Sequence, residues 1–398
     1  MENEKLPILA SVDTCTLCGS CYNACPTQAI TFSKEYLDFS YPQVNVEKCI
    51  GCKQCQKKCP IVTPLQVDHP MDDCTAWIAR NPDLEIRKKS TSGGVFYAAA
   101  QYVLQKGGYV CGAVFDDAFH VRHICSNEIS DVQKMVGSKY AQSDMGTVYQ
   151  QVKALVDKGV LVLYTGCPCQ VAGLNAFLRE SYENLLTFEL ICHGIPSDRM
   201  LMEYTSMQES KNKSNLTNIN FRSKTTGWLN SSIEIDFANH RKYHQVITAD
   251  TYMRGYFGNV YLKESCYNCR FRSFQSGADC MMGDFWGAEV EKHPFDNQSG
   301  ISAVLARGQK GANFFIKLPL EMQKWDLNGI IRYNKTIISS QKPSDIRAQF
   351  YAYAEEYGYE KALKKYLSEP IKVKMKRKLR YYLRCMYNRI MGREKPLY

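Results

Sequence analysis

A chain of 398 residues, 45% hydrophobic and 23% charged, has an ordinary globular composition and is long enough for two or three domains. Its formal net charge is +10, but the segment from Ile371 to Tyr398 holds ten basic residues and one acid, so it carries nine of those charges. The rest of the chain is almost neutral, which argues against a nucleic-acid-binding protein.

No segment has about 18 apolar residues in a row, so no membrane-spanning helix is predicted. Acidic residues precede any apolar run at the N-terminus, which is not the pattern of a secretory signal. We therefore expect a cytoplasmic protein. Because a reducing compartment disfavours disulfides, the 18 cysteines favour metal binding or redox chemistry.

The chain opens with an internal repeat of cysteines. The spacing C-x2-C-x2-C-x3-C-P occurs twice, 34 residues apart: Cys15, Cys18, Cys21 and Cys25, then Cys49, Cys52, Cys55 and Cys59. One tight loop supplies three thiolates to a 4Fe–4S cluster, and the fourth comes from the other repeat. We assign Cys15, Cys18, Cys21 and Cys59 to one cluster (cluster I) and Cys49, Cys52, Cys55 and Cys25 to the other (cluster II).

The alternative is a pair of structural zinc sites, which is disfavoured because such sites usually combine two separated cysteine pairs. Gly19 and Gly51 let the backbone pass close to each cluster, so that amide groups reach the sulfur atoms. The repeat resembles bacterial two-cluster ferredoxins. We therefore predict an α+β, ferredoxin-like domain over residues 1–66.

After a linker over residues 67–74, helix and strand signals alternate. Strands are predicted at 75–79, 109–115, 121–125, 160–164 and 185–190, and helices at 91–106, 147–157 and 169–179. This order predicts a parallel α/β sheet. Beyond residue 215 the pattern becomes richer in strands, with examples at 232–237 and 301–307, and helices are predicted at 344–368 and 372–390.

Several motifs in this body carry a second resemblance. They are STSGG at 90–94, GSKYAQS at 137–143, YTGCPCQVAGL at 164–174, CHGIPS at 192–197, FRSK at 221–224, CYNC at 266–269 and GDFWG at 283–287. Together they resemble the family of coenzyme F(420) hydrogenase/dehydrogenase beta subunits over roughly residues 75–340. The resemblance implies an FAD-binding oxidoreductase with an iron–sulfur cluster beside the flavin.

A flavin also has a chemical reason, because it converts between the single electrons of clusters and the electron pairs of organic substrates. The backbone of Ser92, Gly93 and Gly94 at a helix start suits a phosphate, although a plain helix cap is the alternative. Thr165 and Gly166 end a strand where α/β sheets bind ligands. Further candidate flavin contacts are Lys139, Tyr140, Gln142 and Ser143.

Four cysteines outside the repeat predict a third 4Fe–4S cluster. Cys169 and Cys192 each follow a strand of one sheet, and Cys266 and Cys269 form a C-x2-C loop. Four unrelated buried thiols or a zinc site are the alternatives, and Cys167 is the first substitute if the four lie apart. The other thiols are expected to be inert: Cys74, Cys111, Cys125, Cys280 and Cys385.

We thus predict a ferredoxin-like domain, an α/β flavin-binding body in two regions, 75–156 and 157–340, the second richer in strands, and a helical basic tail at 341–398. The predicted function is electron transfer from a donor through 4Fe–4S clusters to FAD and an unknown two-electron acceptor. Relatives of this fused shape suggest an acceptor in polysaccharide biosynthesis. The alternative is a non-catalytic electron-transfer subunit that docks on a separate enzyme. No catalytic residue is identified.

The predicted partners are a redox protein and a small-molecule substrate, and the tail adds a membrane surface. Its helix at 372–390 spaces Met375, Leu379, Leu383, Met386 and Ile390 three or four residues apart, opposite basic residues. Such a helix suits the inner, anionic face of a membrane. A solvated helix packed on the protein is the alternative.

Overall fold

The computed structural model describes residues 6–67, 70–296 and 299–390. Its contacts divide the chain into two units, each built from two separate stretches. Unit 1 comprises Met1–Arg199 and Leu262–Lys342, and unit 2 comprises Met200–Tyr261 and Pro343–Tyr398. Segments far apart in the sequence therefore fold together. All predicted cluster ligands and flavin contacts belong to unit 1.

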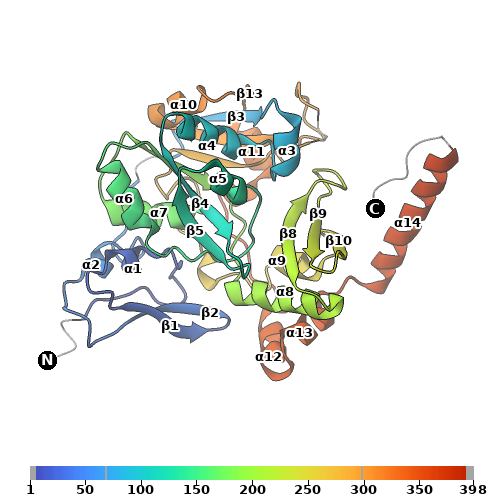
Figure 1. The fold of residues 1–398 in the computed structure, drawn as a ribbon, viewed down its shortest axis with the longest axis horizontal. Helices are drawn as coiled ribbons and strands as arrows, with labels where there is room; N and C mark the ends of the chain where they lie inside the picture. Colours follow the sequence, from blue (N-terminus) through green and yellow to red (C-terminus); the bar gives the residue numbers. More distant parts are fainter. Residues whose placement is uncertain (1–5, 68–69, 297–298, 391–398) are drawn as a thin grey trace. The chain divides into compact units, whose positions relative to one another are not determined.

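The cysteine repeat of unit 1 folds around short elements (Figure 1). They are α1 (Ser20–Ala24), β1 (Ile30–Tyr36), β2 (Phe39–Val44) and α2 (Gln54–Lys57). β1 and β2 form an antiparallel hairpin. A small apolar cluster of this region consists of Cys15, Leu17, Phe39 and Tyr41, and Ala10 and Val12 pack against it.

An eight-stranded sheet forms the body of unit 1, in the order β13-β3-β12-β11-β7-β6-β4-β5. Its strands are β3 (Cys74–Arg80), β4 (Tyr109–Phe115), β5 (Val121–Ser126), β6 (Val162–Gly166), β7 (Leu185–Leu190), β11 (Cys280–Asp284), β12 (Ser302–Arg307) and β13 (Glu321–Trp325). The four central strands β4, β6, β7 and β11 are parallel. The remaining pairs are antiparallel, so the sheet is mixed and the predicted parallel sheet is its centre.

Helices cover both faces of this sheet. In unit 1 they are α3 (Leu84–Lys89), α4 (Val95–Gln105), α5 (Ile129–Met135), α6 (Val148–Val156), α7 (Pro168–Leu178), η1 (Glu264–Cys266), α10 (Gly308–Phe315), α11 (Leu327–Tyr333) and η2 (Lys335–Ile337). Leu163 of β6 joins the main core with α4, α5 and α10. The next residue, Tyr164, points to the opposite face and contacts Tyr149 of α6, with ring centroids 6.0 Å apart.

Two helix predictions need correction, and in both cases a glycine is the cause. The helix predicted at 91–106 begins only at Val95, because Gly94 has a left-handed backbone with φ of +83°. The helix predicted at 344–368 is two helices, α12 (Arg347–Tyr357) and α13 (Tyr359–Leu367). Gly358, with φ of +88°, separates them.

The expectation that Cys111 and Cys125 are inert thiols was wrong. The two residues lie directly opposite each other in the antiparallel pair β4–β5, with Cα atoms 4.1 Å apart, and they form a disulfide. The sequence gap of 14 residues concealed this pairing, because it depends on the register of the hairpin. Cys280 is fully buried in the main core, as expected for an inert thiol. The side chain of Cys385 lies outside the described residues.

Unit 2 contains a three-stranded antiparallel sheet and helices. Its elements are α8 (Asp198–Asn212), β8 (Leu216–Ser223), β9 (Ser232–Phe237), β10 (Lys242–Val246), α9 (Thr251–Phe257), α12, α13 and α14 (Ile371–Ile390). Aromatic residues fill its core, with Tyr252 packed against Tyr204 and Tyr261. In the described part of the chain no helix combines the length and apolar character needed to cross a membrane.

Candidate iron–sulfur and flavin site

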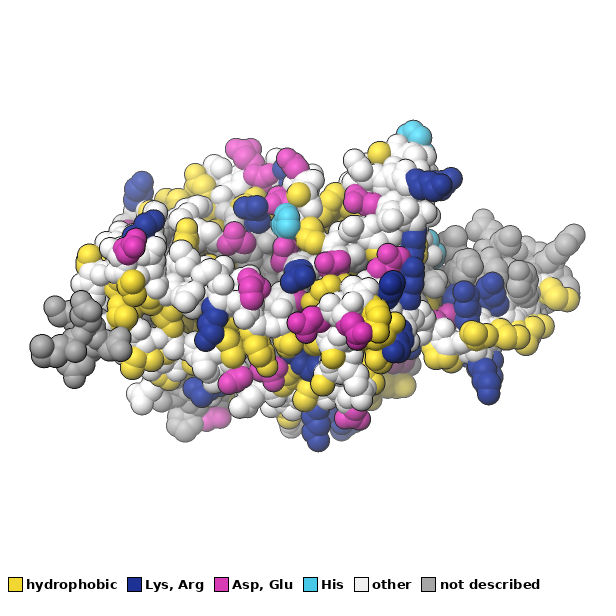
Figure 2. Space-filling model, turned by 90° about the horizontal axis from the view of Figure 1, so that it is seen from below, with side chains coloured by type: hydrophobic (Ala, Val, Ile, Leu, Met, Phe, Trp, Pro, Cys, Tyr) yellow, Lys and Arg dark blue, Asp and Glu magenta, His cyan; other side chains and the backbone are white. Residues whose placement is uncertain are grey.

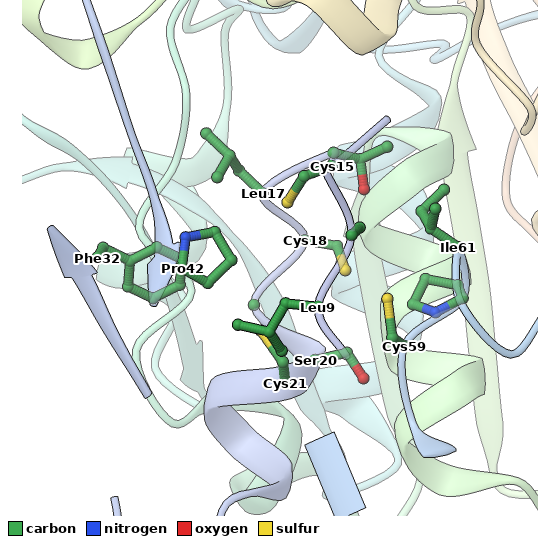
Figure 3. Close-up of a pocket in the computed structure, with 14 residues that line it drawn as sticks. Leu9, Cys15, Leu17, Cys18, Ser20, Cys21, Phe32, Pro42, Cys59 and Ile61 are labelled. Atoms are coloured by element: carbon green, nitrogen blue, oxygen red, sulfur yellow. The ribbon is translucent and has the colours of Figure 1, made fainter. Parts of the chain in front are cut away.

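The eight cysteines of the repeat form two neighbouring groups. Burial, together with the nearby thiols of Cys59 and Cys15, raises the pKa of Cys18 to about 12. Burial likewise raises the pKa of Cys55 to about 11, together with the thiols of Cys25, Cys52 and Cys49. Each group thus takes its fourth cysteine from the other repeat, in the arrangement predicted for clusters I and II. Figure 3 shows the cavity lined by Cys15, Cys18, Cys21 and Cys59.

Backbone amides point at these sulfur atoms. The N–H of Ala29 donates to Cys25 Sγ at 3.1 Å, and the amides of Leu17 and Ser20 donate to Cys15 and Cys18. Gly19 has φ of +80°, and a Cβ at this position would lie 2.8 Å from Cβ of Met145. Such N–H groups stabilise thiolates and tune cluster potentials.

The two groups differ in exposure. Cys15, Cys18 and Cys59 are buried, whereas Cys52 is exposed and Cys49 is half-buried. Because Cys52 is exposed, cluster II is the group with a cysteine at the protein surface. Figure 2 shows one face of the molecule, on which basic, acidic and apolar side chains are interspersed.

The four cysteines predicted to bind a third cluster lie together, in what we call the body cluster site. Cys169 is in the first turn of α7, after β6, and Cys192 follows β7, the parallel neighbour of β6. Burial raises the pKa of Cys169 well above its usual range, and the thiols of Cys269, Cys192 and Cys266 contribute to the rise. The sheet thus delivers two thiols to one edge, where the C-x2-C loop supplies the other two.

The surroundings of this site fit an iron–sulfur cluster. The amides of Gly194, Ile195 and Phe271 donate to Cys192, Cys266 and Cys269, respectively. The guanidinium of Arg272 donates to the carbonyl groups of Cys192 and Thr336. Buried thiols, N–H donors and a nearby cation are what a negatively charged cluster requires.

The arrangement that a single metal ion needs differs from the arrangement that a cluster needs. Among the described residues, no group of three or more His, Cys, Asp or Glu side chains is placed to hold one ion. A zinc ion would draw its four sulfur atoms to about 2.3 Å from one centre. In a 4Fe–4S cluster each thiolate binds a different iron, so the sulfur atoms lie further apart.

The extra thiol of Cys167 is also close to this site. It forms a hydrogen bond with the thiol of Cys192, and this bond is the main reason why the pKa of Cys192 is lowered to about 7. The backbone N–H of Cys167 donates to Oε1 of Gln170 at 2.8 Å, and this hydrogen bond fixes the first turn of α7. Because Cys169 and Cys192 already lie beside the C-x2-C loop, the geometry does not require Cys167 as a substitute ligand.

The three segments predicted to contact a flavin touch one another. Oγ1 of Thr91 is 3.0 Å from Oγ of Ser138, which joins the STSGG and GSKYAQS motifs. The ring of His123 then links the second motif to the end of β6. Its Nδ1 lies 2.6 Å from Oγ of Ser143, and its Nε2 lies 3.1 Å from the carbonyl oxygen of Thr165.

Individual side chains in these segments already have protein partners. Ser92 donates to the carbonyl of Ile301 at 2.8 Å, and the N–H of Gly93 donates to Oγ of Ser302 at 2.9 Å. A Cβ on Gly93 would lie 2.5 Å from the carbonyl oxygen of Ala79, so this glycine is needed for the turn to approach β3. Tight packing thus explains part of the motif.

Lys139 and Gln142 also bond within the protein. Lys139 Nζ donates to the carbonyls of Met135, Val136 and Gly137 at 3.2–3.3 Å and so caps α5, and burial lowers its pKa to about 7. Gln142 Nε2 donates to the carbonyl of Leu17 at 3.3 Å. Tyr140 is half-buried, and Gly166 is the last residue of β6.

Sequence reasoning missed several buried ionisable groups of this region. Burial lowers the pKa of His123 to about 4 and raises that of Glu189 to about 8, where a hydrogen bond from Ser276 opposes the rise. Lys263 is fully buried and Arg272 is 8% exposed. No motif surrounds these residues that would have distinguished them from surface charges, so only the fold reveals them.

Comparison with known proteins supports both the N-terminal cysteine repeat and the body that follows it. Residues 14–62 match the family model "4Fe-4S dicluster domain", and residues 160–326 match the model for the C terminus of "Coenzyme F420 hydrogenase/dehydrogenase, beta subunit". The prediction of a ferredoxin-like 4Fe–4S domain and the resemblance to this family of beta subunits are therefore confirmed. The chain is an iron–sulfur protein.

Several known proteins are similar to parts of this chain. The F subunit of the F(420)H(2) dehydrogenase of Methanosarcina mazei is 24% identical over 215 residues, covering 50% of this chain and 60% of the relative. An uncharacterized polyferredoxin-like protein of Methanocaldococcus jannaschii is 30% identical over 82 residues, covering 17% of this chain and 47% of the relative. The chain thus spans at most 60% of these two relatives.

Among solved structures, the F420-reducing NiFe hydrogenase complex of Methanosarcina barkeri has a similar chain. The TM-score is 0.45 at 18% sequence identity, and the alignment covers 69% of this chain and 92% of the other.

Proposed function

We propose that this chain, which carries the C-terminal region of a coenzyme F420 hydrogenase/dehydrogenase beta subunit, is an FAD-dependent iron–sulfur oxidoreductase. It would take electrons from a redox partner protein and reduce a small two-electron acceptor. When bound, 4Fe–4S clusters supply one-electron transfer and FAD converts single electrons to pairs. The observation that carries the proposal is the grouping of Cys169, Cys192, Cys266 and Cys269 next to the ferredoxin-like domain.

The packing of α7 supports this arrangement. Cys169 and Gly173 are four residues apart, so they lie on one face of the helix with about 6 Å between their Cβ positions. A Cβ on Gly173 would lie 3.0 Å from Sγ of Cys18, a proposed ligand of cluster I. Tyr149 holds the same contact, because its hydroxyl donates to the carbonyls of Cys18 and Gln170 at 2.7 and 2.8 Å. One helical turn thus separates ligands of the two sites.

The exposure of the cysteines in the repeat indicates where electrons would enter the protein. Cys52 of cluster II is exposed, whereas Cys15, Cys18 and Cys59 of cluster I are buried. A partner protein would therefore exchange electrons at cluster II. Cluster I would stand between cluster II and the body cluster site, where Cys169 follows the proposed flavin contacts Thr165 and Gly166 in the first turn of α7.

The flavin is tested by analysing one anaerobically purified sample for iron, sulfide and flavin. We expect about one FAD per chain in the acid-released supernatant, together with about twelve irons. The physical reason is the convergence of the segments around Ser92–Gly94, Lys139–Ser143 and Thr165–Gly166. A sample with about twelve irons and no flavin would reject the FAD-dependent enzyme.

A second candidate function is an electron-transfer subunit that docks on a separate enzyme. It is favoured by the hydrogen bonds that Ser92 and Lys139 already make within the protein. Under this alternative the same sample carries iron without flavin, and it reduces an acceptor only when the partner enzyme is present. A sample whose flavin is bleached or reoxidised by a small substrate on its own would exclude it. Among such substrates, sugar nucleotides and lipid-linked sugars remain the first to test.

We also propose that α14 contacts an anionic membrane surface. Met375, Leu379, Leu383 and Met386 are 55–65% exposed and spaced three or four residues apart. Figure 2 shows apolar side chains in a row along this helix, with Lys and Arg beside them. The side chain of Ile390 lies outside the described residues.

Flotation with liposomes tests this contact. The intact chain should float with vesicles containing an anionic lipid, and a chain ending at Glu369 should stay in the dense fraction. Vesicles of neutral lipid serve as the control, because they lack the charge that basic residues recognise. Equal flotation of both chains, or of neither, would contradict the proposal.

A further inference from the structure

A buried lysine joins cluster I and the body cluster site of unit 1. Lys263 is 0% exposed, and its Nζ donates to the carbonyl of Thr16 at 2.5 Å and to Oε1 of Gln142 at 2.6 Å. Thr16 lies between Cys15 and Cys18 of cluster I, and Lys263 itself is three residues before Cys266 of the body cluster site. The hydrogen bond from Lys263 therefore connects two residues that are 247 positions apart in the sequence.

The position of this ammonium group is held by the backbone as well. The N–H of Lys263 donates to the carbonyl of Ile195 at 2.9 Å, within the loop that follows Cys192. Gln142, which accepts from Lys263, also donates to the carbonyl of Leu17 in the cluster I loop. A charge that is enclosed on both sides by fixed carbonyl and amide oxygens cannot swing away into water.

The charge acts on thiols of both sites. Burial raises the pKa of Cys15 to about 11 and that of Cys266 to about 11, and in each case the Lys263 ammonium opposes the rise. It opposes the burial effect at Cys169 too. These thiolates become cluster ligands under the proposed function, so the cation would lie close to two negatively charged clusters.

We propose that Lys263 is a positioning residue that raises the reduction potentials of cluster I and the body cluster together and so keeps them matched for electron exchange. This inference rests on the proposed function, because it assumes a cluster at the body cluster site. Each reduction adds one electron to a cluster and moves no proton, so a fixed positive charge stabilises the reduced form. The desolvated surroundings strengthen that effect, because little water screens the charge.

The test is an anaerobic redox titration of the full chain, followed by electron paramagnetic resonance, with iron counted in every sample. Lys263→Met and Lys263→Gln remove the charge, Gln keeping a hydrogen-bond donor, whereas Lys263→Arg keeps the charge. We expect Met and Gln to weaken reduction of both clusters at least tenfold, a shift of about 59 mV for one electron. The Arg variant should stay within about half of that shift.

Lys310→Met is the matched control, because Lys310 also donates to two backbone carbonyls, those of Tyr182 and Leu185, and pairs with Asp279. It should leave the potentials unchanged. If Lys263 only holds the two loops together, the Lys263→Gln and Lys263→Arg variants should behave alike, with lowered thermal stability and unchanged potentials. This result would overturn the proposed role of Lys263. A wild-type sample with about eight irons would instead overturn the body cluster. The role of Lys263 would then be tested by the potential of cluster I alone.

Discussion

Replacing both Cys266 and Cys269 by alanine should lower the iron content of anaerobically purified protein from about twelve to about eight atoms per chain. The two residues supply two of the four thiols that meet at the end of β6 and β7. Two thiols cannot hold a four-iron cluster, whereas the eight cysteines of the repeat remain intact. Iron and acid-labile sulfide, measured against protein concentration, check this result.

A control must separate the loss of a ligand from the loss of a buried thiol. Cys280→Ala serves that purpose, because Cys280 is fully buried in the main core and lies outside the group. This variant should keep about twelve irons and lose only some stability. Cys167→Ala should also keep its iron, since Cys169 supplies the contact to the other three cysteines. A double variant that still binds about twelve irons would place the third cluster elsewhere.

Much of unit 1 was predictable because its proposed cluster ligands follow short, regular spacings in the sequence. The crossed assignment of Cys25 and Cys59 follows from the reach of one loop around a cube of iron and sulfur. The strands ending before Cys169 and Cys192 were predicted to lie in one sheet, and β6 and β7 are adjacent and parallel strands of that sheet. In each case a local pattern carries its own geometric consequence.

The remainder depends on contacts that no local pattern encodes. Lys263 and Thr16 meet only because the chain returns to unit 1 after residue 262. The disulfide of Cys111 and Cys125 depends on hairpin register, which one residue of slip would destroy. His123 sits in an ordinary strand, and its neutral ring matters only because Ser143 and Thr165 enclose it.

Removing iron should unfold the ferredoxin-like region while the eight-stranded sheet stays folded. One small apolar cluster of that region consists of Cys15, Leu17, Phe39 and Tyr41, of which Cys15 is itself a proposed ligand. In a region so small, metal binding energy is folding energy. Hydrogen exchange should therefore quicken in the hairpin of β1 and β2 by at least about a hundredfold, or about 2.8 kcal/mol, after chelation under reducing conditions.

The body provides the internal control for this experiment. Its main core contains nineteen buried residues, and strands such as β6 and β7 contribute Leu163 and Phe188 without any help from iron. Amides of these strands should keep their protection in the iron-free protein. The loop at Cys18 and helix α1 at Asn23 should respond less than the hairpin, because Tyr149 and Gly146 of the body hold them by hydrogen bonds of 2.7 and 2.9 Å. A hairpin that keeps full protection without iron would mean that packing on the body, and not cluster binding, folds the ferredoxin-like region.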